Sequence, residues 1–248
     1  MELGIAGKRA AVAAASQGLG YATAAALAGE GVQVAICGRD RAKAEAAAAT
    51  IGNGCTPLVA DVGTVAGASG FVTAATEVLG GIDILVANAG GPPPGTFASI
   101  DDVDEYAKAF ELNALSTIAM CRLAVPAMQE RKWGRVVAIT SIAVRQPIPT
   151  LILSNTARAG LTGFLKTLAR EVASDGVTVN SLQPGLHATD RIKALHEDPD
   201  ALGAGVPAGF IGSAADFGRV AAFLCSESAR YVTGTAIPVD GGVDAGLQ

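Results

Sequence analysis

A glycine-rich segment near the start of the chain has the spacing of a phosphate-binding turn. Residues 13–20 read AAASQGLG, and a helical pattern begins at the glycines. Glycine lets the backbone approach a pyrophosphate, and the N-terminus of the following helix supplies free N–H groups and a positive dipole. Glycines in strand–helix turns are also common for packing reasons, so both interpretations stay open. If a pyrophosphate binds here, the contact residues are expected to be Ser16, Gly18, Leu19 and Gly20.

A charged pair follows the second apolar run, in the segment CGRD at residues 37–40. At this place an acidic side chain would bind the 2′-hydroxyl of a dinucleotide's adenosine ribose, whereas an arginine favours a 2′-phosphate. Arg39 therefore predicts that NADP(H) is preferred over NAD(H). A solvated charge at a turn is the alternative, and the neighbouring Asp40 keeps the NAD(H) option open.

Glycine and polar residues also stand directly after the later apolar runs. Each group is weak alone, because an Asn–Ala–Gly turn, for example, is most often only a turn. Their order along the chain is hard to obtain by chance, and it predicts one binding site. The residues are Asp61 and Val62 after the third run, Asn88, Ala89 and Gly90 after the fourth, Ser141 after the fifth, and Pro184, Gly185 and Thr189 after the sixth.

Seven short apolar runs are the predicted strands. Most are apolar on both faces, which is typical of a parallel sheet covered by helices. The expected strands are Arg9–Ala14, Gln33–Cys37, Pro57–Ala60, Ile82–Ala87, Arg135–Thr140, Thr178–Leu182 and Ala236–Val239.

Helical patterns alternate with these runs, which predicts one α/β domain with a doubly wound, seven-stranded parallel sheet. Gly80 is expected to stop one helix, and Ser213 to cap the last one, which continues through Ser226. The other expected helices are Leu19–Ala28, Arg41–Ala49, Val65–Leu79, Asp101–Arg131 and Ile152–Ser174.

The segment from Asp190 to Gly212 breaks this alternation, because it is rich in glycine, proline and charge. We expect a mobile insertion over the carboxyl ends of the strands, where ligands bind in such sheets. Four apolar side chains indicate a partly apolar substrate pocket, although they could equally pack on the core. They are Leu195, Leu202, Val206 and Phe210.

Composition narrows the class of protein. The chain has 248 residues and a net charge of −5, so nothing in its charge favours binding to nucleic acid or to an anionic membrane. No run approaches the roughly 18 apolar residues of a membrane span. The apolar run after Lys8 and Arg9 could mimic a signal peptide, but a first strand fits better, and a cytoplasmic protein is expected. The four scattered cysteines have no metal-ligand spacing, which favours reduced thiols.

From its first strand to the terminal VDGG, the whole chain resembles the short-chain dehydrogenase/reductase family. The family's TGxxxGxG turn corresponds to residues 13–20, with Ala14 at the first glycine, where a methyl group is acceptable if the backbone φ is negative. Its NNAG motif corresponds to ANAG at residues 87–90. Its active-site asparagine and serine correspond to Asn113 and Ser141.

The resemblance also exposes a departure. The family places YxxxK thirteen residues after the serine, where this chain has Ser154 and Arg158 in SNTARAG. The flanking GRVVAITS and GLTGFLKTLARE fix this alignment without a gap, and the tyrosines, Tyr21, Tyr106 and Tyr231, lie far away. This SNxxR variant resembles bacterial family members that are commonly described as 3-oxoacyl-carrier-protein reductases.

In the family, the tyrosine protonates the substrate carbonyl while the lysine lowers its pKa and holds the ribose. Serine is a far weaker acid than tyrosine, and arginine, with a pKa above about 12, does not give up a proton. Arg158 could still hold the ribose and stabilise an oxyanion, with Ser141 binding the substrate oxygen and water supplying the proton. His187 is a further candidate acid, although a loop histidine without a catalytic part is favoured, and His196 is weaker still.

Three functional hypotheses follow. The leading one is an NADP(H)-dependent oxidoreductase that acts on a carbonyl or alcohol with atypical proton delivery. The second is a catalytically weak or inactive dinucleotide-binding protein that serves as a sensor or partner subunit, and the third is an enzyme with non-redox chemistry. By resemblance, a homotetramer or homodimer is expected, built on helices 101–131 and 152–174. No metal is expected.

Overall fold

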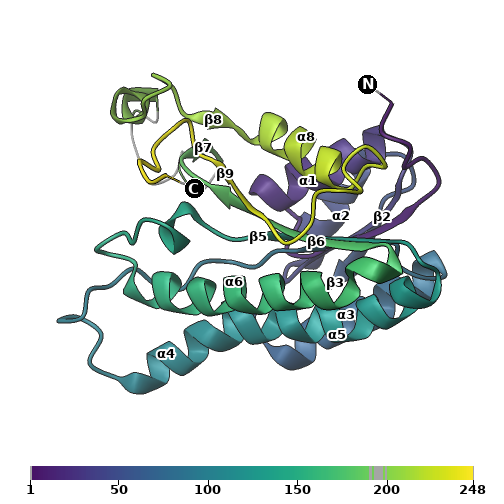
Figure 1. Ribbon diagram of the computed structural model, residues 1–248, viewed down its shortest axis with the longest axis horizontal. Helices are drawn as coiled ribbons and strands as arrows, with labels where there is room; N and C mark the ends of the chain where they lie inside the picture. Colours follow the sequence, from purple (N-terminus) through teal and green to yellow (C-terminus); the bar gives the residue numbers. More distant parts are fainter. Residues whose placement is uncertain (1, 190–191, 193–197, 199, 248) are drawn as a thin grey trace.

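Seven parallel strands form the central sheet, in the spatial order β3-β2-β1-β4-β5-β6-β9 (Figure 1). The computed structural model describes residues 2–189, 192, 198 and 200–247. The predicted parallel sheet and each of its seven strands are confirmed. Their bounds are β1 (Arg9–Val12), β2 (Gln33–Gly38), β3 (Thr56–Val59), β4 (Ile84–Ala87), β5 (Gly134–Ile139), β6 (Val177–Pro184) and β9 (Ala236–Val239).

Strands β1 and β4 are neighbours in the sheet, and the strand order reverses between them. Ala10 pairs with Val34 of β2 on one side and with Ile84 of β4 on the other. Chain connections leave such a point in opposite directions, which opens a crevice at the carboxyl ends of the strands. The fold therefore places the segments after β1 and β4 beside this crevice.

Helices cover both faces of the sheet (Figure 1). One core, around Leu27 and Phe217, packs α1 (Gly18–Gly29), α2 (Arg41–Ile51) and α8 (Ala214–Leu224) on one face. A second core, around Phe71 and Leu161, packs α3 (Val65–Leu79), α5 (Ser116–Glu130) and α6 (Ile152–Val172) on the other. Burial on both faces explains why β1, β2, β4 and β5 are mostly apolar.

Two predicted helix ends are confirmed. Gly80 ends α3 in the left-handed conformation, with φ +71°, which glycine adopts without steric cost. Ser213 begins α8, and its Oγ accepts a hydrogen bond from the N–H of Ala215 at 3.1 Å. Each residue satisfies backbone groups that the helix itself leaves unpaired.

A helical stretch covers most of the predicted residues 101–131, but it is not one uniform α-helix. The structure has α4 (Val103–Phe110), a π-helical turn (Glu111–Leu115) and α5, which follow one another without a break in the chain. A π-turn inserts one extra residue, and such insertions are frequent at functional sites. Apolar spacing does not reveal the extra residue, which is why the sequence predicted one uniform helix. Asn113 lies within this turn.

A small second sheet was not predicted. Strands β7 (His187–Ala188) and β8 (Gly212–Ser213) pair in parallel and join the two ends of the predicted insertion. Within the insertion, a 3₁₀ helix spans Asp200–Gly205, Val206 is buried, and Phe210 is 65% exposed. Leu195 and His196 lie outside the described residues.

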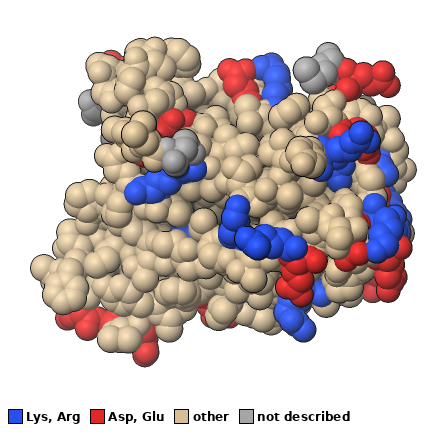
Figure 2. Space-filling model, in the orientation of Figure 1, with Lys and Arg blue, Asp and Glu red and all other residues tan. Residues whose placement is uncertain are grey.

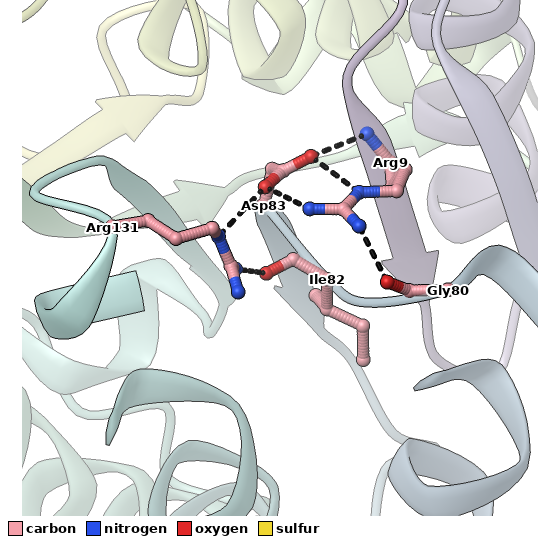
Figure 3. A network of polar contacts seen from close by, with 5 residues as sticks. All are labelled: Arg9, Gly80, Ile82, Asp83 and Arg131. Atoms are coloured by element: carbon pink, nitrogen blue, oxygen red, sulfur yellow. Dashed lines mark hydrogen bonds and ion pairs between the residues drawn. The ribbon is translucent and has the colours of Figure 1, made fainter. Parts of the chain in front are cut away.

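At the amino ends of the strands, Asp83 joins two arginines from different elements (Figure 3). Its carboxylate lies 2.8 Å from Nε of Arg9 and 3.3 Å from Nε of Arg131. Burial alone would raise the pKa of Asp83, but the hydrogen bonds and positive charge of Arg9 outweigh it and hold this pKa below its usual value. The network connects the starts of β1 and β4 to the end of α5, at the amino ends of the strands and therefore opposite the crevice.

The surface and the thiols agree with the composition. On the face drawn in Figure 2, acidic and basic side chains lie next to one another and the left half is mostly uncharged. No helix within the described residues has the length and apolar character to cross a membrane. All four cysteines are free thiols, and burial raises the pKa of Cys37, Cys121 and Cys225 to about 12, so these thiols are protonated at neutral pH.

Candidate active site

A cleft of about 510 Å³ lies at the carboxyl ends of the strands. This volume is in the range of small-molecule and cofactor sites. Most of the predicted site residues line it, from segments that are far apart in the sequence. They are Ser16, Gly18, Leu19, Arg39, Asp61, Val62, Asn88, Ala89, Gly90, Ser141, Ser154, Arg158, Pro184 and Thr189.

The glycine turn forms one end of the cleft, where α1 begins. Gly18 has φ +66°, and the side chain of Gln17, the residue before the helix, makes no capping hydrogen bond. The first N–H groups of α1 therefore remain available to a ligand at the cleft, and the positive end of the helix dipole favours an anion there.

Gly20 does not line the cleft but is required beneath it. A Cβ atom on this residue would lie 2.7 Å from Nδ2 of Asn88 and 2.8 Å from the carbonyl oxygen of Ala14. The same Nδ2 donates to that oxygen at 3.1 Å. Asn88 thus fixes the turn from the end of β4, in a space that only glycine leaves open.

Ala14 does not meet the condition under which a methyl group is acceptable at this position, because its φ is +46° and not negative. An L-residue in the left-handed region brings its Cβ close to the backbone, at a cost of roughly 1–2 kcal/mol. The turn therefore keeps a backbone shape that suits a glycine. Ala14 lines the cleft, so this strain lies at the site itself.

At the end of β2, the two neighbouring charges have different functions. Arg39 lines the cleft on its exposed lip. Asp40 precedes α2, and its Oδ1 accepts a hydrogen bond from the N–H of Lys43 at 3.1 Å. The carboxylate that kept a second interpretation open is thus a helix cap, and Arg39 is the residue of this pair that reaches the cleft.

The other end of the cleft holds two serines and Arg158. Oγ of Ser141 accepts a hydrogen bond from the N–H of Ala143 at 3.1 Å, in a short 3₁₀ helix that spans Ile142–Val144. Its hydroxyl proton remains free to donate, because a serine hydroxyl both donates and accepts. Ser154 lies in the first turn of α6 and is 7% exposed.

Arg158 lies one helical turn after Ser154, on the same face of α6. The side chain is 8% exposed, and its Nη1 donates to the carbonyl oxygens of Ile139 at 3.0 Å and of Thr140 at 3.1 Å. These carbonyls belong to the end of β5. Arg158 extends from α6, and the two carbonyl oxygens at the end of β5 fix the position of its guanidinium close to Ser141.

The comparisons with known proteins agree with this geometry. The family model described as enoyl-(acyl carrier protein) reductase matches residues 13–244. Dehydrogenase/reductase SDR family member 4 of Bos taurus is 35% identical over 243 residues, which cover 95% of this chain and 86% of that protein. The 3-oxoacyl-(acyl-carrier-protein) reductase FabG of Escherichia coli (strain K12) is 35% identical over 238 residues, 96% of this chain and 97% of that protein. The chain belongs to the short-chain dehydrogenase/reductase family.

Solved structures of reductases share the fold. The L-sorbose reductase of Gluconobacter frateurii, complexed with NADPH and L-sorbose, superposes with a TM-score of 0.92 at 31% identity and full coverage of both chains. YwfH, an NADPH-dependent reductase involved in bacilysin biosynthesis, gives 0.92 at 26% identity, over 98% of this chain and 100% of that chain.

Asn113 of this short-chain dehydrogenase/reductase lies behind the cleft rather than on its lining. Its Nδ2 donates to the carbonyl oxygen of Gly90 at 2.9 Å, which joins the π-turn to the segment after β4. Its Oδ1 is buried and accepts no hydrogen bond from the described residues. The side chain thus supports Gly90, a lining residue, and presents a further acceptor.

His187 and Gly185 are also absent from the lining. His187 is 5% exposed, and burial lowers the pKa of its ring below the usual value, against a hydrogen bond to Gly185 and the charge of Asp240. A Cβ atom on Gly185 would lie 2.8 Å from Cα of Asp240, so this glycine is required for close packing. Neither residue faces the cleft directly.

The sequence analysis missed several lining residues. Most are immediate neighbours of predicted residues, at the carboxyl ends of the strands or in the segments that follow them. The missed residues are Gln17, Gly38, Ala60, Gly63, Gly91, Leu112, Ile139 and Thr140. Leu112 belongs to the π-turn, so no strand-end pattern could have indicated it.

Proposed function

We propose that this protein is an NADP(H)-dependent oxidoreductase that interconverts a small carbonyl compound and its alcohol, with atypical proton delivery. One observation carries the proposal. The uncapped N-terminus of α1 and Arg39 lie in the same cleft as Ser141, Ser154 and Arg158. A dinucleotide bound with its phosphates at α1 would extend toward these polar groups. The NADPH-bound sorbose reductase supports the choice of cofactor.

The residues present fit the dinucleotide. The pyrophosphate would lie at the N–H groups of α1, with Gly18 allowing close approach. Arg39 would bind the 2′-phosphate through charge-assisted hydrogen bonds, which a planar guanidinium makes well. Asp61 and Val62, after β3, line the same part of the cleft. Pro184, at the end of β6, would contact the nicotinamide half, and Thr189, after β7 and beside Gly18, would contact the cofactor near the pyrophosphate.

Bound NADPH supplies the hydride for carbonyl reduction. Ser141 donates a hydrogen bond to the substrate oxygen, and the nearby Ser154 hydroxyl can donate a second one. Neither serine gives up its proton at neutral pH, because its acidity is far below that of tyrosine, whose reference pKa is about 10. The two hydroxyls therefore polarise and orient the carbonyl.

Arg158 stabilises negative charge on that oxygen without transferring a proton. Its guanidinium is held by the carbonyls of Ile139 and Thr140, so its charge is in place before the reaction. Preorganised charge of this kind is the strongest contribution that such a site makes to rate. Arg158 also binds the ribose hydroxyls, with Asn113 supporting the cleft from Gly90. The proton comes from water.

A second candidate function is dinucleotide binding without efficient turnover, as in a sensor or partner subunit. The observation that favours it is that no side chain suited to donate a proton lies beside Ser141 and Ser154 on the described lining. The ionisable residues there are Arg39 and Asp61, which follow β2 and β3, and Arg158. General acid catalysis is worth about 10²–10⁴ in rate, and its loss would leave a binding protein.

The deciding experiment follows the absorbance of NADPH during incubation with ketones, ketoses and 3-oxoacyl thioesters. The proposal expects consumption with at least one class, and a loss of at least about tenfold in Ser141→Ala and Arg158→Ala. Thr156→Ala, on the exposed side of the same helix, serves as the control and retains activity. Binding of NADPH without consumption by any carbonyl compound would favour the second candidate.

We propose further that the chain forms a homotetramer or homodimer through α5 and α6. Leu115 and Leu123, at the π-turn and on α5, are about half exposed, and Phe164 and Leu168 on α6 are only partly buried. Light scattering at micromolar concentration tests this. Leu123→Lys should shift the mass toward the monomer, whereas Val78→Lys on α3 should leave it unchanged. A monomeric wild type contradicts the proposal.

A further inference from the structure

His187 occupies a position between two residues of the cleft lining without lining the cleft itself. It follows the turn of Pro184 and precedes Thr189, both of which face the cleft. The side chain is buried, although the segment around it lies at the edge of the domain. The contacts of this buried, titratable ring therefore bear on the position of its neighbours in the cleft.

Two contacts orient the ring of His187. Nδ1 lies 3.2 Å from the carbonyl oxygen of Gly185, within the turn that follows β6. The ring packs edge-to-face against Phe217 of α8, with the centroids 5.2 Å apart and the planes at 84°. The ring therefore connects the turn after β6 to helix α8, which packs on one face of the sheet. Aromatic pairs of this geometry contribute about 0.5–1.5 kcal/mol to stability.

Strand β8 closes over the same ring. A Cβ atom on Gly212 would lie 2.7 Å from Cδ2 and 2.8 Å from Nε2 of His187, so only glycine leaves room for the imidazole here. The N–H of Gly212 donates to the carbonyl oxygen of Leu186 at 2.9 Å. The ring is thus enclosed by the turn, by β8 and by α8.

The backbone of His187 is hydrogen-bonded to Thr189, a residue of the cleft lining. Its carbonyl oxygen accepts a hydrogen bond from the N–H of Thr189 at 2.8 Å. Cγ2 of Thr189 in turn lies 3.9 Å from the place a Cβ would take on Gly18, so this side chain lies against the phosphate-binding turn. A displacement of His187 would therefore move Thr189 relative to Gly18.

The enclosure suits a neutral ring and not a charged one. In the neutral tautomer with a proton on Nδ1, the ring donates to Gly185 and leaves Nε2 as an acceptor. Protonation adds a donor at Nε2, which lies beside Gly212 and makes no hydrogen bond with the described residues. Asp240, after β9, is the charged group that acts on the ring among the described residues, and burial outweighs it.

We propose that the neutral ring of His187 positions Thr189 at the cofactor cleft, so that adding a proton to this ring weakens dinucleotide binding. The inference rests on the proposed function, because it assumes that the dinucleotide binds beside Gly18 and Thr189. His187 is then a positioning residue, and the site loses its cofactor as the pH falls.

The test is the dissociation constant of NADP⁺, measured by titration calorimetry from about pH 8 to about pH 4, because burial lowers the pKa of this ring below the usual histidine value of about 6.5. The 2′-phosphate also titrates near pH 6, so each pH is judged by the ratio of the wild-type constant to that of His187→Phe. Phe keeps the contact with Phe217 and cannot take up a proton. Below the pKa of the ring, this ratio should rise about tenfold per pH unit.

Two further variants separate the ring from its surroundings. His187→Gln keeps a donor for Gly185 without titrating in this range, and it should behave like His187→Phe. His196→Gln removes the other histidine of the chain and should follow the wild type. A ratio that stays constant with pH overturns the inference, as does a His196→Gln curve that matches His187→Phe.

A measurement on the wild type alone covers the case in which the variants do not fold. Linkage is reciprocal, so saturation with NADP⁺ must lower the pKa of His187, followed by NMR on protein with labelled histidines. An unchanged pKa overturns the inference while the proposed function stands. A protein that binds no dinucleotide at any pH overturns both.

Discussion

Nη1 of Arg158 lies 3.1 Å from the carbonyl oxygen of Thr140, the residue that directly precedes Ser141. A second bond from the same nitrogen reaches Ile139 at 3.0 Å. Hydrogen bonds from a charged donor contribute about 1.5–3 kcal/mol each, so the guanidinium is firmly tied to the end of β5. This tie connects the residue at the family's lysine position to the residue at the family's serine position.

The first prediction follows from this tie. If the site is rebuilt around arginine, Ser154→Tyr combined with Arg158→Lys should lower kcat/KM by at least about tenfold, since an ammonium cannot replace the planar fork of a guanidinium. The tyrosine must also enter a position that is 7% exposed, and such overpacking costs typically 1–3 kcal/mol of stability. Kinetics on the best substrate of the wild type, together with thermal unfolding, measure both effects. A clear gain of activity in the double variant contradicts a rebuilt site.

The second prediction concerns cofactor choice. Arg39→Ala should weaken NADPH binding by about 10- to 100-fold, because it removes a charge-assisted bond to the 2′-phosphate worth about 1.5–3 kcal/mol. Binding of NADH should change little. Arg41→Ala is the matched control, because Arg41 pairs with Glu45 on the exposed side of α2 and does not line the cleft. Equal affinity of the wild type for NADPH and NADH would falsify the preference.

A third prediction uses the strained turn. Ala14→Gly relieves the left-handed backbone but adds freedom to the unfolded chain, which together should stabilise the protein by roughly 0.5–1 kcal/mol. NADPH affinity should not fall. Ala13→Gly, at a neighbouring position without a positive φ, should instead destabilise the protein by a similar amount. Chemical denaturation measures all three proteins, and a less stable Ala14→Gly would show that the strain is absent.

The fourth prediction is the pH dependence of the Asp83 network. The folded-state pKa of Asp83 lies below its unfolded value, which is about 3.9. Its contribution to stability is therefore fully present above that value and is lost as the pH falls through the folded-state pKa. Asp83→Asn should cost about 1–3 kcal/mol at neutral pH, and the difference from wild type should shrink in acid.

Asp216→Asn is the control for this experiment, since Asp216 pairs with Arg219 on the exposed side of α8. Its effect at neutral pH should be far smaller, because surface ion pairs contribute little. An Asp83→Asn variant whose deficit persists unchanged down to pH 3 would show that the carboxylate charge is not what stabilises the network.

The sequence predicted the sheet well because buried parallel strands are mostly continuous apolar runs, as in β2, β4 and β5. It also predicted most of the cleft, since chemistry-bearing residues follow these runs at one edge of the sheet. It did not predict the π-turn that contains Asn113, because the extra residue of a π-turn leaves no mark in the apolar pattern. The positive φ of Ala14 was likewise hidden, because an alanine at this position gives no indication of a left-handed backbone.

The position of His187 shows another limit. Sequence order places it between Pro184 and Thr189 and therefore near the cofactor, which made it a candidate acid. Its orientation depends on contacts with Gly212 and Phe217, residues 25 to 30 positions away in the chain. The ring is directed away from the cleft lining by β8 and α8, which pack against the segment that follows β6.

The most direct test of the central claim is hydride transfer itself. NADPH that carries deuterium on the transferred position of its nicotinamide ring should be incubated with the wild type and a carbonyl compound, and the alcohol product analysed by mass spectrometry. The account predicts one deuterium in each product molecule, with the remaining new hydrogen taken from water. Tight binding of NADPH without deuterium in any alcohol, across ketones, ketoses and 3-oxoacyl thioesters, would contradict it.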